Sequence, residues 1–387
     1  MKIAQRVSYK RASPPLDIGL RVKEIKAEGG FVIDFGVGEP DFETPDDIKE
    51  AGIEAIKGGF TRYPPTAGFS DLRLAICRKL KEENGLDYVP EQVVVTCGAK
   101  HALYNIFQVL CEPGDEVIIP SPYWMSYPHM VRFAGATPVI IHTTVRSGFK
   151  LTARQFEEAI TSKTRAVIIN SPSNPTGAVY SRDELMRIAE IAVSRQIYIV
   201  SDEIYEKLVY DGLNYCSVAA LGEEAYDFTI TVNGFSKSHA MTGWRIGYLA
   251  APREIAQAVT FLQGNSTSGA CSISQKAAIA ALKTDKKELK YMVNEFSRRR
   301  DYMVAELNKM EKISWLKPSG AFYVFCDISR SGLGSVDFSR QLFEQYRVAV
   351  FPGVVFGWDS HIRISFANSM DNIREGLSYL RNFLQGL

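Results

Sequence analysis

The chain has 387 residues, 46% of them hydrophobic and 23% charged, which is ordinary for a globular protein with a sizeable core and predicts two domains. Its 45 lysines and arginines nearly balance its 44 aspartates and glutamates, and the net charge of +1 excludes a strong field toward nucleic acid or an anionic membrane. No apolar run reaches membrane-spanning length, and residues 1–15 lack the apolar segment of a signal peptide.

The six cysteines contain no CxxC pair and no spacing typical of a zinc site, so we expect no metal centre. Several of them lie in apolar stretches, which favours buried free thiols in a reducing compartment. Together with the lack of a signal peptide, this predicts a cytoplasmic protein. The cysteines stand at positions 77, 97, 111, 216, 271 and 326.

The N-terminal segment combines a polar arm, a predicted helix over residues 18–28 and a short strand over 32–35. The following stretch GVGEPD, residues 36–41, begins like a dinucleotide-binding fingerprint. Its proline and aspartate interrupt the GxGxxG pattern and no helix is predicted after it, so a nicotinamide site is disfavoured. Gly38 suits either a close approach of the backbone to a ligand or a plain turn.

From residue 45 onward, predicted strands and helices alternate. The strands are nearly continuously apolar, and the helices between them are amphipathic, as over 101–111 and 182–195. This pattern predicts an α/β fold with a mostly parallel seven-stranded sheet covered by helices on both faces, whose ligands bind beyond the carboxyl ends of the strands. The predicted strands span 93–96, 116–119, 138–143, 166–171, 197–201, 229–232 and 246–251.

After residue 284 the pattern changes to a long charged helix over 286–310. Its apolar side consists of Met292, Phe296, Met303 and Leu307. It is followed by a segment over 322–327, a helix near 337–345 and a strand over 361–366. We interpret this region as a smaller α+β domain that the N-terminal segment completes. The predicted domains are therefore 46–283 for the large one, and 1–45 with 284–387 for the small one.

The stretch NGFSKSHAMTGWRIGY, residues 233–248, lies between two predicted strands. Lys237 and Arg245 therefore share a loop that suits a reactive amine and an anion-binding group, although a solvated basic turn is the alternative. The stretch resembles the lysine loop of class I aminotransferases, the pyridoxal 5′-phosphate (PLP) enzymes typified by aspartate aminotransferase. The resemblance implies PLP fold type I, with Lys237 in a Schiff base with PLP and with Ser236 and Arg245 contacting its phosphate.

A second phosphate-binding element is predicted at TCGAKH, residues 96–101, where a strand meets a helix start. Backbone N–H groups at the positive end of a helix dipole bind phosphate well, although many strand–helix turns contain Gly-Ala. In the family, the positions of Gly98, Ala99 and Lys100 bind the cofactor phosphate.

Asp202 and Tyr205 follow the predicted strand over 197–201. A carboxylate at the end of a buried strand can pair with the pyridine nitrogen of PLP, or it can cap a helix. The resemblance implies the pairing, and it implies that Tyr205 donates to the phenolic oxygen of the ring and lowers the pKa of Lys237.

Two further motifs flank the same site. Residues 170–177, NSPSNPTG, read as a turn from the residues alone. The resemblance implies that Asn174 contacts the ring oxygen and the substrate carboxylate, with a cis peptide bond before Pro175. Trp124, in SPYW, is either a core residue or, as the resemblance implies, the aromatic cover of the cofactor ring.

Arg363 lies opposite Ile362 and Ile364 in a predicted strand, where it could be a surface residue. The resemblance implies instead that it binds the substrate α-carboxylate with two parallel hydrogen bonds, and that Gly38 belongs to the substrate site. It also implies that Tyr63 reaches the phosphate of a neighbouring subunit, and hence a homodimer.

The resemblance spans nearly the whole chain, and its positions occur in the expected order. Gly234 departs from the pattern, because some members carry a second phosphate-binding hydroxyl there, so we expect a looser phosphate site. The matching positions are Gly38, Tyr63, Gly98, Trp124, Asn174, Asp202, Tyr205, Lys237, Arg245 and Arg363.

The implied activity is a ping-pong transfer of an amino group from an L-amino acid to a 2-oxo acid. Lys100 lies in the first turn of a predicted helix, where a cation is unfavourable without a nearby anion. That anion is either the cofactor phosphate or a second carboxylate on the substrate. The neutral alternative is a solvent-exposed lysine without a ligand, and Trp124 and Tyr205 would then favour aromatic amino acids. In the prokaryotic aspartate aminotransferases that the chain resembles, this lysine serves the distal carboxylate of the substrate, so we expect aspartate and glutamate, with oxaloacetate and 2-oxoglutarate.

Three alternatives remain open from the sequence. The first is an aromatic or kynurenine-type aminotransferase, and the second is a PLP lyase on the same fold. The third is a non-catalytic regulator. It is disfavoured by the intact lysine, and because the catalytic fold would account for all 387 residues, no room is left for a DNA-binding or partner-binding module.

Overall fold

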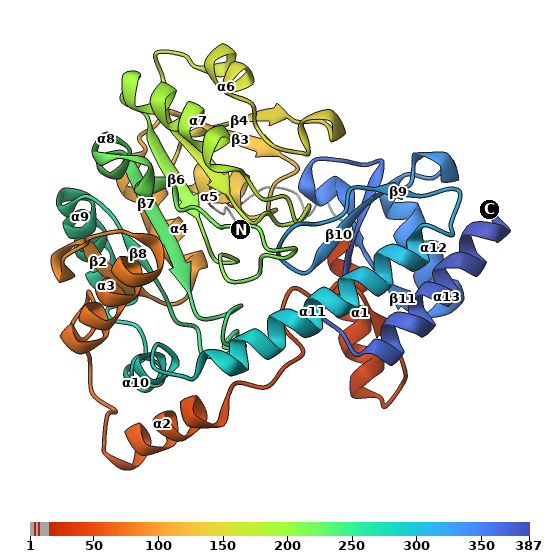
Figure 1. The fold of residues 1–387 in the computed structure, drawn as a ribbon, viewed down its shortest axis with the longest axis horizontal. Helices are drawn as coiled ribbons and strands as arrows, with labels where there is room; N and C mark the ends of the chain where they lie inside the picture. Colours follow the sequence, from red (N-terminus) through yellow and green to blue (C-terminus); the bar gives the residue numbers. More distant parts are fainter. Residues whose placement is uncertain (1–3, 5–6, 8–14) are drawn as a thin grey trace.

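The computed structural model describes residue 4, residue 7 and residues 15–387. The polar N-terminal arm expected from the sequence lies almost entirely outside the described residues. Two parts, each with its own sheet, make up the rest (Figure 1). No helix in the described portion is both long and apolar enough to cross a membrane.

A seven-stranded sheet forms the centre of the large part. All seven strands expected from the sequence are present, each within two residues of its predicted ends. The neighbours are parallel except β8, which is antiparallel to both strands beside it. In spatial order the strands are β2 (Val93–Thr96), β8 (Gly247–Ala250), β7 (Thr229–Gly234), β6 (Tyr198–Asp202), β5 (Thr164–Asn170), β3 (Glu116–Ser121) and β4 (Thr137–His142).

Helices cover both faces of this sheet because its apolar side chains alternate between one buried cluster on one face and two on the other, which confirms the predicted architecture. One face packs against α4 (Ala99–Leu110), α5 (Tyr127–Phe133) and α9 (Arg253–Gly264). The other face packs against α2 (Asp46–Lys57), α3 (Ser70–Asn84), α6 (Ala153–Ala159), α7 (Arg182–Ser194), α8 (Glu223–Asp227) and α10 (Ser272–Ala281).

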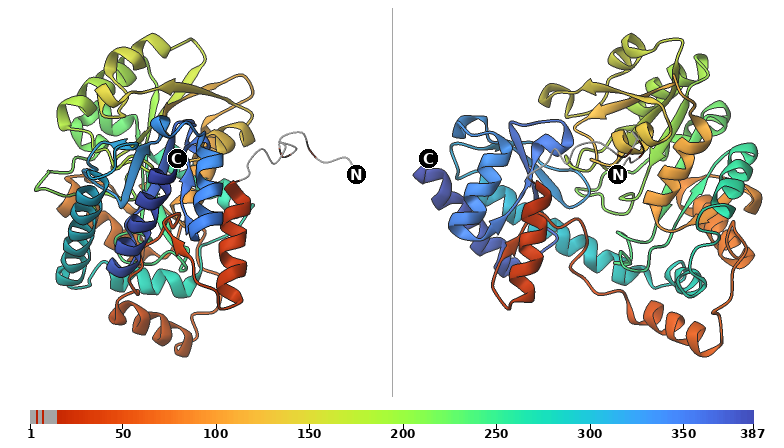
Figure 2. Two further views of the ribbon diagram at one scale, coloured as in Figure 1. Left: turned by 90° about the vertical axis from the view of Figure 1, so that its right-hand side faces the viewer. Right: turned by 180° about the vertical axis from the view of Figure 1, so that it is seen from behind.

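The small part contains a four-stranded antiparallel sheet and a parallel pair formed by the N-terminal segment. Its sheet consists of β12 (Phe351–Pro352), β13 (His361–Ser365), β10 (Tyr323–Asp327) and β9 (Ser314–Trp315), and the pair is β1 (Ile33–Asp34) with β11 (Val348–Ala349). Its helices are α1 (Pro15–Ala27), α11 (Lys286–Leu307), α12 (Ser335–Tyr346) and α13 (Met370–Gly386). Figure 2 shows α1 beside α12.

The long helix α11 begins where predicted and buries the four apolar residues expected of it, although it ends at Leu307 instead of residue 310. Ile33 and Phe35 join the same cluster, so the N-terminal segment packs with the C-terminal region. The domain boundaries proposed above stay a prediction. Helix α13 was not predicted, although its buried Ile373 and Leu377 carry a helical spacing that could have revealed it.

The cysteine expectation was right only in part. All six thiols are free, and Cys111 and Cys326 are buried, which raises the pKa of the Cys111 thiol to about 12. Three others are half-buried, and Cys271 is exposed at the start of α10, so it does not belong to a core.

Candidate active site

A pocket of about 440 Å³ lies where the carboxyl ends of the parallel strands face the small part. Both parts contribute to its wall, as the alternation of strands and helices predicted. Of the residues singled out in the sequence, those that line it are Gly38, Ala99, Lys100, Trp124, Asn174, Asp202, Tyr205, Ser236, Lys237, Arg245 and Arg363.

Lys237 stands on the loop between β7 and β8, and its amine donates a hydrogen bond of 2.5 Å to the carbonyl of Gly38. The side chain is partly buried, and loss of hydration, with help from the nearby charges of Arg363 and Arg245, lowers its pKa to about 8 although Glu39 opposes the shift. A lysine with such a pKa carries a substantial neutral fraction near physiological pH. It can therefore act as a base or a nucleophile.

Asp202 ends β6 and is 5% exposed. Its carboxylate accepts hydrogen bonds from the Tyr127 hydroxyl at 2.6 Å and from the Ile204 N–H at 3.3 Å, but it forms no ion pair within the described residues. Burial raises its pKa to about 6, even though these hydrogen bonds and Lys237 lower it. No α-helix begins here, so the helix-capping alternative is wrong. The pocket therefore contains a buried carboxylate that forms no ion pair with any of the described residues.

Arg363 is a buried group of the opposite charge that likewise forms no ion pair with the described residues. It lies on β13 and is 5% exposed, whereas its neighbours Ile362 and Ile364 point into the core of the small part, so the surface alternative is wrong. Its guanidinium donates to the Asn174 side-chain oxygen at 3.0 Å and to the Gly36 carbonyl at 2.7 Å. Its Nε is buried without a partner, and no carboxylate among the described residues pairs with it.

The start of α4 and the lysine loop form a third polar region. Gly98 precedes α4 at a φ of 83° and does not itself line the pocket, whereas Ala99 and Lys100 in the first turn do. No side chain caps this helix, so N–H groups of its first turn are available to an anion. A Cβ at Gly98 would lie 2.7 Å from the Arg245 guanidinium, so glycine makes room for the arginine. Arg245, at a φ of 53°, donates to the Thr242 carbonyl at 2.9 Å. Ser236 lines the same wall, and the region suits a phosphate.

Lys100 and Trp124 close the remaining side. The Lys100 amine lies 4.8 Å from the centre of the Trp124 ring. Burial and the charge of Arg245 lower its pKa, and no carboxylate among the described residues pairs with it. Lys100 is therefore a cation in a pocket, available to an anionic group of a ligand.

Tyr205 and two residues outside the motifs complete the pocket. The Tyr205 hydroxyl shares a 2.8 Å hydrogen bond with that of Tyr323, whose ring lies 4.2 Å below the Arg363 guanidinium. Tyr323 and Tyr127 were missed in the sequence. Tyr127 follows the SPYW motif by three residues, which was an available signal, whereas only strand pairing brings Tyr323 beside Arg363. Further lining residues that were missed are Gly36, Leu103, Met125, Ile204, Thr242, Phe351 and Phe356.

Two expected features lie elsewhere. Tyr63 is 95% exposed and is no part of the pocket of its own chain. A Cβ at Gly234 would lie 3.0 Å from the Gly247 Cα, so glycine lets these two strands approach closely, and Gly234 does not line the pocket. The looser phosphate site expected from this glycine stays a prediction. The expected cis bond before Pro175 is present.

Comparisons with known proteins agree with this geometry. The family model of aminotransferase class I and II matches residues 31–380. An aspartate aminotransferase of Bacillus sp. (strain YM-2) is 46% identical, over 99% of this chain and 99% of its own length. A probable aspartate/prephenate aminotransferase of Aquifex aeolicus is 45% identical, over 99% of this chain and 98% of its own.

A solved structure gives the same result at the level of the fold. The Thermus thermophilus aspartate aminotransferase with maleate superimposes with a TM-score of 0.94 at 39% identity, covering 99% of this chain and 100% of that one. The pocket therefore lies on a fold that matches these enzymes, and it holds a partly buried lysine of lowered pKa, an aspartate and an arginine, the last two without ion-pair partners among the described residues. The chain therefore belongs to the class I and II aminotransferases.

Proposed function

We propose that this aminotransferase uses PLP to move the amino group of aspartate or glutamate to 2-oxoglutarate or oxaloacetate. The observation that carries the proposal is the pair of buried, opposite and unpaired charges in one pocket, Asp202 and Arg363. Burying a charge without a partner is unfavourable, so such a pocket is suited to a ligand that brings a cation to Asp202 and an anion to Arg363.

The residues fit PLP group by group. Asp202 would pair with the ring nitrogen, Tyr205 and Asn174 would bind the ring oxygen, and Trp124 would cover the ring. The phosphate would bind the α4 start at Gly98, Ala99 and Lys100, together with Ser236 and Arg245. When bound, PLP supplies an electron sink for the bond that breaks at the substrate Cα.

The chain's own groups then have separate tasks. Arg363 binds the α-carboxylate of the substrate, with Asn174 and Gly38 beside it, and orients the Cα hydrogen. Lys237 would take that proton from Cα and return it to the carbon two bonds away, across the nitrogen, which its pKa of about 8 permits near neutrality. The rings around Arg363 exclude water, which strengthens the ion pair with the carboxylate.

Product analysis tests this proposal. Aspartate and 2-oxoglutarate should give oxaloacetate and glutamate in equal amounts, with parallel double-reciprocal plots as a ping-pong order requires. Release of ammonia with a single substrate would instead assign the chain to the lyases. Preference for phenylalanine or tyrosine over aspartate would favour the aromatic alternative.

The role of Lys100 distinguishes an enzyme for acidic substrates from one for aromatic substrates. The relatives are named for aspartate and prephenate, and the Thermus structure holds maleate, a dicarboxylate. Because no carboxylate of the described part of the chain pairs with the Lys100 amine, we assign this amine to the distal carboxylate of the substrate.

Lys100→Ser should therefore reduce kcat/KM for aspartate by about 10- to 150-fold, equivalent to about 1.5–3 kcal/mol for a lost charged hydrogen bond. Phenylalanine and alanine should lose much less, because they have no second carboxylate. The exposed Lys163→Ser is the matched control and should change none of the three. An equal loss for all three amino acids would assign Lys100 to the phosphate and remove the support for acidic substrates.

We also propose a homodimer in which Tyr63 completes the partner's phosphate site. Tyr63 is 95% exposed and Phe261 77%. They lie on neighbouring segments, because the Gln263 amide donates a 2.7 Å hydrogen bond to the Thr66 carbonyl and the Ser272 hydroxyl donates one to the Arg62 carbonyl. Exposed aromatic residues gathered in this way favour a protein interface.

Mixing Tyr63→Ala and Lys237→Ala chains tests the shared site. Hybrid dimers would contain one site with both defects and one intact site, so the mixture should exceed the mean activity of the two parents after subunit exchange. Native mass spectrometry checks the exchange. Hybrids that form without any gain in activity would place Tyr63 outside the partner's site.

Besides the second subunit, the only partners that we propose are small molecules, namely amino acids and 2-oxo acids. The near-neutral net charge agrees with the lack of a nucleic-acid or membrane partner. We propose a cytoplasmic location on the same grounds as above, namely the cysteine content, and all six thiols of the described residues are free.

A further inference from the structure

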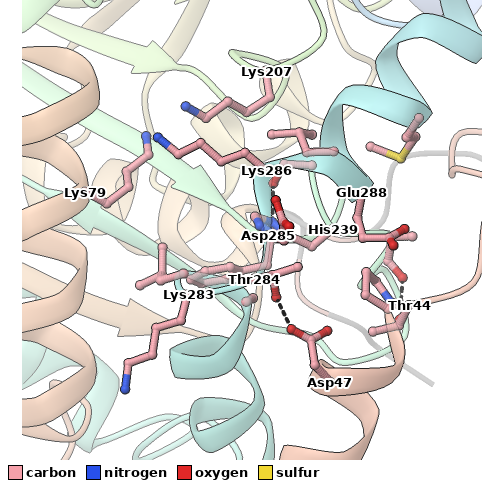
Figure 3. A pocket seen from close by; sticks show the side chains of 18 of the residues that line it. Thr44, Asp47, Lys79, Lys207, His239, Lys283, Thr284, Asp285, Lys286 and Glu288 are labelled. Atoms are coloured by element: carbon pink, nitrogen blue, oxygen red, sulfur yellow. Dashed lines mark hydrogen bonds between the residues drawn. The ribbon is translucent and has the colours of Figure 1, made fainter.

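The turn at residues 202–207 has two opposite faces. Asp202 and Tyr205 line the central pocket, whereas Glu206 and Lys207 line a second cavity of about 740 Å³ on the far side of the lysine loop. Figure 3 shows this cavity, with Lys207 at its upper edge. Asp202 ends β6 and is held by the sheet, so whatever holds the far face of the turn helps to hold Tyr205, which directly precedes Glu206.

Glu206 is held at both of its carboxylate oxygens by helix α3. One oxygen pairs with the Lys79 amine, and the other accepts a 2.8 Å hydrogen bond from the Asn84 amide. Lys79 in turn donates to the Asn84 oxygen at 2.8 Å, which closes a three-membered network. The side chains of Glu206 and Lys79 are 5% and 10% exposed, so the pair is far better shielded from water than a surface ion pair.

The neighbouring lysines keep the Glu206 carboxyl group ionised. Burial alone would raise the pKa of Glu206, but the charges of Lys79 and Lys207 and its hydrogen bonds bring it below its ordinary value. Lys207 also pairs with Glu83 at 2.6 Å, and Lys286 lies 3.4 Å from the same carboxylate. Figure 3 shows the amines of Lys79, Lys207 and Lys286 on the same side of the cavity. Glu206 is thus an ionised carboxylate among cations.

Glu203 holds the other end of the turn in a different way. Its carboxyl accepts hydrogen bonds from the hydroxyls of Ser201 at 2.8 Å and Ser217 at 2.7 Å, close to where β6 ends. Its backbone carbonyl accepts from the Glu206 N–H at 2.9 Å. The start of the turn is therefore tied to the sheet, and its end, which carries Tyr205, is tied to α3 through Glu206.

We propose that Glu206, through Lys79 and Asn84, is a positioning residue that holds Tyr205, and with it the Asp202 turn, in register with the central pocket. This inference rests on the proposed function, because it assigns the turn a task in binding the cofactor. A displacement of about 1 Å in a group that contacts a reacting system can lower a rate by about 100-fold. The network is thus a second layer of the active site, reached from the opposite cavity.

The test compares Glu206→Gln and Lys79→Met with Lys150→Met, the matched control. Lys150 pairs with Glu184 at 2.6 Å and is partly buried, far along the chain from the turn. Glu206→Gln and Lys79→Met should lower kcat by about 10- to 100-fold with less than about a threefold change in the KM for aspartate, because Arg363 and Lys100 are untouched. Lys150→Met should lower only the urea midpoint.

Two measurements separate positioning from a purely structural role. The pH midpoint of the cofactor's visible absorbance in Glu206→Gln and Lys79→Met should move in the same direction as in Tyr205→Phe. Lys79→Arg keeps the cation and should leave the midpoint close to the wild-type value. The apo-protein of Glu206→Gln should also bind PLP more weakly, as measured by quenching of tryptophan fluorescence. If Glu206→Gln does not fold, Asn84→Ala, which keeps the ion pair and removes one hydrogen bond, should show the same changes at smaller size.

A variant Glu206→Gln with a lowered urea midpoint but unchanged kcat, absorbance midpoint and PLP affinity would overturn the proposal. Failure of the proposed function would look different, because the wild-type protein would then fail to transaminate aspartate. The PLP affinities of the wild-type and Glu206→Gln apo-proteins would still decide whether Glu206 positions the turn.

Discussion

Lys237→Ala is expected to remove steady-state transamination, with a loss of kcat greater than about 10⁴-fold, because one amine carries both the covalent link to PLP and the proton transfer. Binding of PLP should survive, since the residues assigned to the phosphate are untouched. Initial rates with aspartate and 2-oxoglutarate measure the loss. In the wild-type protein, borohydride reduction and peptide mapping should find the cofactor attached to Lys237. Attachment at another lysine would show that the loop is wrongly assigned.

The lowered pKa of Lys237 also predicts how the stability of the apo-protein depends on pH. That pKa is lowered from 10.5 to about 8, so the folded protein binds fewer protons than the unfolded chain between these values. The free energy of unfolding should accordingly rise with pH across that window and be reduced by a constant amount below it. Lys237→Met should stabilise the apo-protein near pH 7 by about 2 kcal/mol, allowing for the partial exposure of the side chain. Urea unfolding at pH 7 and pH 10 measures this, and equal stability of both proteins at both pH values would contradict it.

Asp202→Asn should lower kcat by about 10²- to 10⁴-fold while the fold survives, because the ring nitrogen of PLP would lose the anion that keeps it protonated. None of the described residues forms an ion pair with this carboxylate, and burial raises its pKa to about 6 although the charge of Lys237 opposes the shift. A cationic ring nitrogen would restore its ionised form. Single-turnover rates with aspartate measure the effect, and near-normal rates would dismiss the pairing.

Tyr127→Phe is the matched control for Asp202. It removes the 2.6 Å hydrogen bond from the carboxylate but keeps the charge, so its loss should be about 10-fold or less. The stability of the apo-proteins gives a second check. The pKa of Asp202 is raised from 3.8 to about 6, so the folded protein binds more protons than the unfolded chain between these values. The contribution of Asp202 to the free energy of unfolding is complete below about 3.8 and is lost as the pH rises through about 6. Asp202→Asn should therefore be at least as stable as the wild-type apo-protein at pH 7.

Local patterns in the sequence were sufficient for the main elements. Runs such as residues 93–95 and 166–169 contain only aliphatic residues, and these form strands that are buried on both faces. The four apolar residues of α11 recur at helical spacing, and they are buried as that spacing predicted. The two-residue strands β9, β11 and β12 carry no such pattern, because a segment that short is held only by its partners.

The sequence by itself determined which chemical groups the chain has and on which loops they stand, because residue type and the strand-to-loop transitions are local properties. Only the tertiary structure decided what surrounds them. It places Arg363 beside Asn174 and Gly36, residues 189 and 327 positions away in the chain. It leaves Arg363 and Asp202 without an ion-pair partner among residues 15–387. It also ties Glu206 to α3, and it turns Tyr63 away from its own pocket. Such contacts depend on the packing of distant segments, and the same packing sets the burial that shifts the pKa values of Lys237 and Asp202.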